Sequence, residues 1–130
     1  MYLLHHNYGG LTVAIIRPTG DILEEFEAII PLDGDEVIID QGISVTSTDH
    51  EAIEAFISNV DVTVNGEVNG RVNGIRFLAA PETLFDYDVT IGDSGRVFAV
   101  GAAISLGGSI PFEGRGTLIP SVKLCSLRRN

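Results

Sequence analysis

The chain contains copies of a repeat, and valine or isoleucine occupies the same four positions, here called slots, in each copy. This repeat constrains the fold more than any other feature of the sequence. Neighbouring members of a slot are separated by 22 to 29 residues. The slots are Val37, Val62 and Val89; Ile39, Val64 and Ile91; Val45, Val68 and Val97; and Ile53, Ile75 and Ile104. A weaker copy supplies Val13, Ile15, Ile22 and Ile30. One copy cannot bury its own apolar side chains, so we expect the copies to stack.

Three Asn-Gly pairs fall within residues 65–74, which read NGEVNGRVNG. Taken alone, such pairs indicate a tight hairpin turn or a flexible linker. Alignment with residues 91–101 places Val68 in the same slot as Val45 and Val97. The glycines therefore mark corners between strands, where we expect them to supply positive φ angles.

The pattern predicts an all-β protein, a short parallel β-helix or β-solenoid of about three to four coils with an irregular N-terminal cap. The 130 residues form a single domain by size. We expect residues 1–36 to be an N-terminal arm and cap, 37–108 the repeat coils, and 109–130 a C-terminal cap and arm.

A second interpretation is a β-sandwich or an α+β domain with one or two short helices. Thr48 and Glu51 fit a helix capping box, and residues 49–58 continue with apolar residues at helical spacing. The segment from Ile22 to Ile30 has a similar apolar spacing ahead of Pro31.

Residues 42–53, GISVTSTDHEAI, begin a degenerate motif whose later copies include NGIRF at 73–77 and AAISL at 102–106. Over about residues 37–108 the chain resembles the repeats of bacterial surface β-helices, such as autotransporter passengers, and the small β-helices of phage virions. The resemblance implies a structural role, with a phage decoration (cement) protein as the nearest type.

The formal net charge of −10 argues against nucleic acid and anionic membranes as partners. No apolar run approaches the 18 residues of a membrane span, and the first residues, MYLLHHNYGG, lack the features of a secretion signal. We therefore expect assembly in a host cytoplasm and a final location in the virion. The single Cys125 predicts a packed thiol.

Several motifs resemble catalytic or metal-binding sequences but do not match the patterns that such sites require. His5 and His6 are adjacent and point to opposite faces of a strand. Residues 33–36, DGDE, do not match a calcium loop, and residues 92–95, GDSG, fill a turn of the repeat. Glu24, Glu25 and Glu27 could serve acid–base chemistry, but no sequence feature brings two carboxylates together. We predict no catalytic, cofactor or metal site.

The expected function is that of a non-enzymatic capsid decoration protein that stabilises the head lattice. A homotrimer is expected, with the major capsid protein or another virion protein as partner. Possible contacts are Phe85, Tyr87, Arg128 and Arg129. The alternative is a fibre-tip, adhesin-like or glycan-binding module, and a carbohydrate-active enzyme would require two convergent carboxylates.

Overall fold

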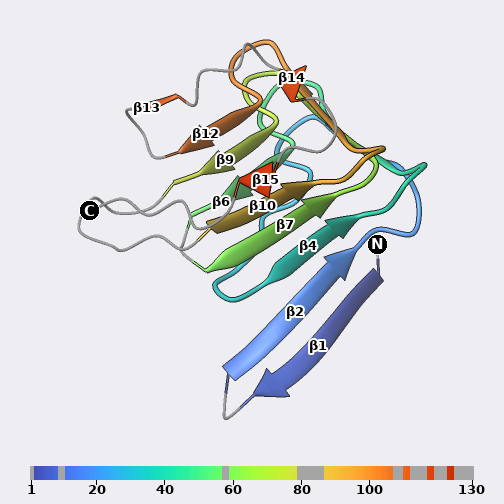
Figure 1. Cartoon of the computed structure of the whole chain (residues 1–130), viewed down its shortest axis with the longest axis vertical. Helices are drawn as coiled ribbons and strands as arrows, with labels where there is room; N and C mark the ends of the chain where they lie inside the picture. Colours follow the sequence, from blue (N-terminus) through green and yellow to red (C-terminus); the bar gives the residue numbers. More distant parts are fainter. Residues whose placement is uncertain are drawn as a thin grey trace.

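The computed structural model describes residues 2–8, 11–56, 59–78, 87–106, 110–111, 117–118 and 123–124. These residues form strands, turns and loops, and none of them lies in a helix. Parallel strands stack into three sheets that wind around a common axis, as Figure 1 shows. The predicted all-β solenoid is therefore confirmed, and the alternative with helices at 22–30 and 49–58 is wrong for the described residues.

Each sheet collects one strand from every coil. Sheet A contains, in spatial order, β1 (Tyr2–Tyr8), β2 (Leu11–Arg17), β4 (Glu36–Ile39), β7 (Val60–Val64), β10 (Tyr87–Ile91) and β15 (Lys123–Leu124). Sheet B contains β14 (Thr117–Leu118), β11 (Arg96–Ala99), β8 (Glu67–Gly70), β5 (Ser44–Ser47) and β3 (Ile22–Glu24). Sheet C contains β13 (Ile110–Pro111), β12 (Ile104–Leu106), β9 (Ile75–Phe77) and β6 (Ile53–Ala55).

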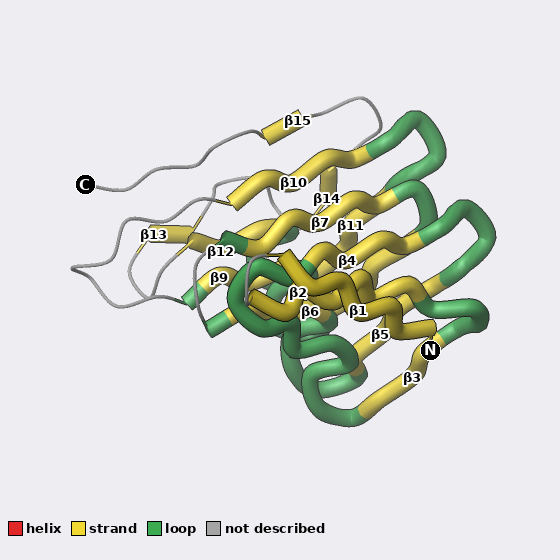
Figure 2. Tube along the Cα trace, turned by 90° about the horizontal axis from the view of Figure 1, so that it is seen from below, coloured by secondary structure: helices red, strands yellow, loops and turns green. Residues whose placement is uncertain are grey.

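Three full coils follow in chain order, namely β4–β5–β6, β7–β8–β9 and β10–β11–β12. Their strands pair in parallel with their counterparts in the next coil, and Figure 2 shows the resulting stack from below. The residues of each apolar slot lie opposite one another in the strand register, for example Val45, Val68 and Val97. These side chains are buried because alternate strand residues point to the axis.

The first, weaker copy follows a different register from the one expected. Ile22 lies opposite Val45 as its slot requires. Ile16, and not Val13, lies opposite Val37, and Ile29, and not Ile30, bridges to Ile53. A shift of one residue moves a side chain to the other face of a strand. Accordingly Ile29 is 3% exposed whereas Ile30 is 48% exposed.

The expected helix around residues 49–58 is replaced by a turn and strand β6. The Ser47 hydroxyl accepts a hydrogen bond from the His50 amide at 3.0 Å, which closes the turn before the strand. The Thr48 amide donates to the Glu24 carbonyl oxygen at 2.9 Å, and not to the Glu51 side chain as a capping box would require. The Glu51 carboxylate instead accepts hydrogen bonds from Asn73 and Arg76 of the next coil. Tertiary contacts therefore override the local helix signal.

The glycines of the Asn-Gly segment serve close packing and not positive φ. Among the described residues, positive φ angles occur at Gly34, Gly42 and Asn59. A Cβ at Gly66 would collide with the backbone oxygens of Asp40 and Ile43 in the preceding coil. The chain turns so close to its neighbour that no side chain fits there.

An antiparallel hairpin of β1 and β2 extends sheet A at its N-terminal end (Figure 1). Arg17 at the end of β2 donates two hydrogen bonds to Asp40, at 2.7 and 2.8 Å, and these lower the pKa of the Asp40 carboxyl. This pair joins the hairpin to the corner that follows β4. No helix long and apolar enough to cross a membrane occurs within the described part of the chain.

Candidate functional site

A shallow hollow of about 410 Å³ lies on the corners that join sheet A to sheet B. Four residues, 40–43, separate β4 from β5, and four residues, 92–95, separate β10 from β11. The corner between them has only two residues, Asn65 and Gly66. The hollow therefore lies where a short corner recedes between two longer ones.

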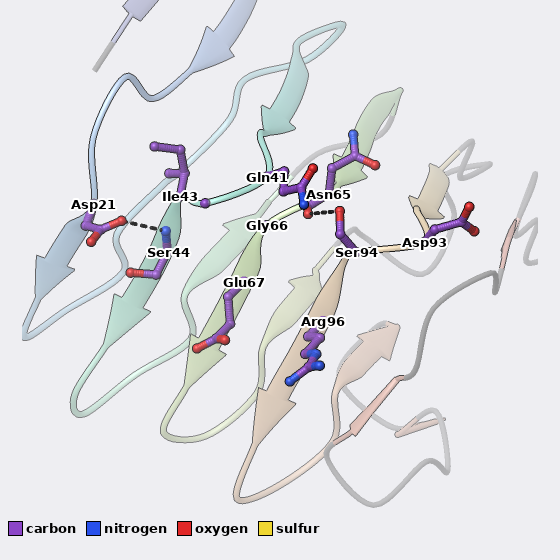
Figure 3. Close-up of a pocket in the computed structure, with 11 residues that line it drawn as sticks. Asp21, Gln41, Ile43, Ser44, Asn65, Gly66, Glu67, Asp93, Ser94 and Arg96 are labelled. Carbon is purple, nitrogen blue, oxygen red and sulfur yellow. Dashed lines mark hydrogen bonds between the residues drawn. The ribbon is translucent and has the colours of Figure 1, made fainter.

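The hollow is lined by polar groups, several of which already hold neighbouring coils together (Figure 3). The Asp21 carboxylate accepts a hydrogen bond from the Ser44 amide at 2.8 Å. The Ser94 hydroxyl donates to the Asn65 carbonyl oxygen at 2.7 Å. Ser94, in the GDSG segment, thus has a structural partner in the neighbouring coil.

Charged side chains of opposite sign line the same hollow on adjacent strands. Glu67 of β8 and Arg96 of β11 are register partners and both border it. None of the described lining residues is aromatic. Such a surface offers hydrogen bonds to a polar ligand but no ring on which a sugar could stack.

A second cluster lies near the junction of sheets B and C and combines three glutamates, a histidine and an arginine. Glu27 follows β3, His50 and Glu51 precede β6, Glu54 lies in β6 and Arg76 in β9. The Glu27 Oε1 and His50 Nδ1 atoms are 3.4 Å apart. Arg76 contacts Glu51 at 3.1 Å and Glu54 at 3.8 Å.

The carboxylates of this second cluster outnumber the cationic group among them. Glu51 and Glu54 are 3% and 5% exposed. Burial raises the pKa of Glu54, the neighbouring Glu51 and Glu27 raise it further, and Arg76 opposes them. The Arg76 Nε atom is buried without a hydrogen-bond partner. The cluster therefore carries an excess of negative charge in a poorly solvated place.

Two convergent carboxylates, one with a raised pKa, are the groups that glycoside cleavage employs. In this chain Glu51 and Glu54 are covered, so a sugar bond cannot lie between them in this conformation. Their contacts with Asn73 and Arg76 connect β6 and the turn before it to the next coil. The geometry supports a structural role for this pair.

Sequence reasoning missed this cluster, although one signal for it was available. Aligning Ile53 with Ile75 also aligns the next residues, Glu54 and Arg76, which are register partners. The approach of Glu27 to His50 had no such signal, because both lie in irregular turns between strands. Of Glu24, Glu25 and Glu27, the last joins the cluster, and the first two are exposed.

The remaining residues that the sequence analysis singled out lie in other parts of the fold or outside the residues that the structure describes. His5 and His6 lie on β1 opposite Ala14 and Val13. Asp35 of the acidic DGDE turn is buried and accepts hydrogen bonds from the amides of Ala14 and Leu32, which fits a structural turn. The backbone of Tyr87 begins β10. The Tyr87 side chain and the residues Phe85, Cys125, Arg128 and Arg129 lie outside the described part.

Comparison of the chain with protein-family models, with curated proteins and with solved structures finds no match in any of the three. The fold class therefore rests on the strand topology of this chain alone.

Proposed function

We propose that the protein is a non-enzymatic structural component of a virion, a decoration protein that binds and stabilises a capsid lattice. The observation that carries the proposal is the coil stack, whose polar and charged clusters link one coil to the next. The two most buried carboxylates, Glu51 and Glu54, are engaged in this way. Such a stack provides a rigid shape for assembly and leaves this acid pair inaccessible to a substrate.

The charge distribution suggests how such a protein would attach. The chain carries a net charge of −10, but its last residues, SLRRN, are basic. A C-terminal segment of this kind would be attracted to an acidic capsid surface, while the acidic coils would remain in solvent. The major capsid protein is the proposed partner, and Arg128 and Arg129 are the proposed contacts.

The test is co-sedimentation of the purified protein with undecorated capsids assembled from the major capsid protein of the same genome. We expect binding that saturates at a fixed ratio to capsid subunits and weakens as salt is raised. Arg128→Ala combined with Arg129→Ala should reduce binding. Arg71→Ala is the matched control, because it removes an exposed arginine from the coils.

A glycan-binding or adhesin-like role is the second candidate, because the polar hollow at the A–B corners offers hydrogen bonds to a glycan even though its described lining has no ring for stacking. A glycan array would then give a positive signal that Glu67→Gln and Arg96→Ala abolish. Binding to the array together with no sedimentation on any capsid would overturn the decoration proposal in favour of this one.

A further inference from the structure

We propose that Glu27, His50 and Glu51 form a binding site for a divalent transition-metal ion, with Zn²⁺ as the best fit. One ligand atom from each residue lies within 4.8 Å of the other two. The site requires no partner protein, so its test is separate from that of the capsid function.

The separation of Glu27 and His50 fits two ligands of one ion. Their nearest oxygen and nitrogen atoms are 3.4 Å apart. A charge-assisted hydrogen bond would be shorter, at about 2.7–2.9 Å. Zinc bonds of about 2.0–2.2 Å at a tetrahedral angle place neighbouring ligand atoms about 3.3–3.5 Å apart.

The ligand types select the class of metal. An imidazole nitrogen suits zinc, nickel, copper or iron, whereas magnesium and calcium prefer sites made entirely of oxygen. Three protein ligands leave a fourth tetrahedral position for water. His50 therefore distinguishes this cluster from a merely acidic surface.

The surroundings of the three residues also suit an ion. The Glu51 carboxylate is held by Asn73 and Arg76, each at 3.1 Å, and such second-layer hydrogen bonds orient metal-binding carboxylates. The side chains of His50 and Glu27 are 42% and 22% exposed, so both can adjust to an ion that arrives from solvent.

The balance of charges in the cluster also favours a bound cation. Glu27, Glu51 and Glu54 lie close enough to interact, and the guanidinium of Arg76 contacts two of them, Glu51 and Glu54. A divalent ion would offset the remaining negative charge. It would also tie the turn after β3 to the turn before β6, which are already joined by hydrogen bonds from Ala28 and Ile29 to the Ala52 oxygen.

The test is calorimetric titration of the EDTA-treated full-length protein with zinc chloride, supported by metal analysis after dialysis. We expect saturable binding of one ion per chain and a higher unfolding temperature with zinc. Glu27→Gln and His50→Ala should each weaken binding by about tenfold or more. Both side chains are partly exposed, and circular dichroism would verify that each variant folds.

Two controls localise the site. His5→Ala combined with His6→Ala removes the other histidines of the chain, and Glu24→Gln removes an exposed carboxylate near the cluster. Both should bind zinc as the unaltered protein does. Absence of saturable binding, or zinc binding that survives Glu27→Gln and His50→Ala, would overturn the proposal. Loss of binding in the His5 and His6 variant, or displacement of zinc by a modest excess of magnesium, would also overturn it.

Discussion

Gly66 lies at the tightest corner of the solenoid, where the chain passes from sheet A to sheet B in two residues. A Cβ at this position would meet backbone oxygens of Asp40 and Ile43, which cannot rotate away as side chains can. The sequence identified the corner correctly from its Asn-Gly pair. The expected positive φ angle was wrong, because the sequence of one segment does not show how closely its backbone approaches the neighbouring coil.

Replacement of Gly66 by alanine should therefore destabilise the fold. We expect Gly66→Ala to lower the free energy of unfolding by about 1–3 kcal/mol, the usual cost of overpacking, as measured by urea denaturation. Gly20→Ala is the control, because nothing lies within 4 Å of its added Cβ. Its effect should stay within about 0.5 kcal/mol. Equal effects of the two substitutions would contradict the packing explanation.

The raised pKa of Glu54 predicts that the stability of the fold depends on pH, which is again an effect of a single residue. Its pKa is raised above the ordinary 4.5, mainly by burial. The folded state therefore binds its proton more tightly than the unfolded chain does. The resulting stabilisation is complete below the unfolded pKa and is lost as pH rises through the folded pKa.

Glu54→Gln removes this titration, so its stability relative to the unaltered protein should increase as pH rises from about 4 to about 8. Urea unfolding at a series of pH values measures the difference. Glu24→Gln, at an exposed site, makes the same change of charge and should show a much smaller trend. A relative stability of Glu54→Gln that falls with rising pH would show that attraction to Arg76 outweighs burial.

At the scale of strands, the repeat predicted the fold class because its four slots fall on buried, inward-facing positions of parallel strands. Val37, Val62 and Val89 lie opposite one another in sheet A. The register of the N-terminal copy could not be predicted in the same way. Apolar residues occupy both faces around Val13 to Ile16 and around Ile29 and Ile30, so the sequence offers two registers and burial selects one.

The ladder in sheet C provides a test at this scale. Ile75 is fully buried between Ile53 and Ile104 of the adjacent coils. Ile75→Val should cost about 0.5–1.5 kcal/mol of unfolding free energy, and Ile75→Ala about 2–5 kcal/mol. Val72→Ala, at a side chain that is 44% exposed, should change it by less than about 0.5 kcal/mol. A similar cost at both positions would argue against a buried ladder.

At the scale of the whole molecule, four large apolar side chains from β3 to the segment before β4 are exposed. Leu23, Phe26, Ile30 and Leu32 are each about half exposed or more. Exposed apolar side chains that adjoin one another on the surface commonly mark an interaction site, which makes Leu23 and Phe26 candidates for a contact between chains. The strand register could have predicted the Glu54 and Arg76 pair of the cluster around Glu51. The approach of Glu27 to His50 and the corner hollow could not be predicted, because they depend on which turns the coil stack brings together.

The homotrimer expected from the sequence stays a prediction, and it belongs to the scale of the whole molecule. Size-exclusion chromatography with light scattering should give a mass near three times 13.9 kDa. Leu23→Lys combined with Phe26→Lys tests whether these two side chains lie in the contact between subunits. If they do, the double substitution should reduce the measured mass. A single species of 13.9 kDa for the unaltered protein would contradict the trimer.

The two-residue corner at Asn65 and Gly66 has a consequence for protein engineering. The equivalent corners of the coils before and after it have four residues, so longer connections fit between the corresponding strands of those coils. A peptide inserted between Gln41 and Gly42 of the preceding corner would leave the close packing at Gly66 intact, because both residues are exposed and nothing lies within 4 Å of an added Cβ at Gly42. The coil stack would then act as a display scaffold whose insertion point borders the polar hollow.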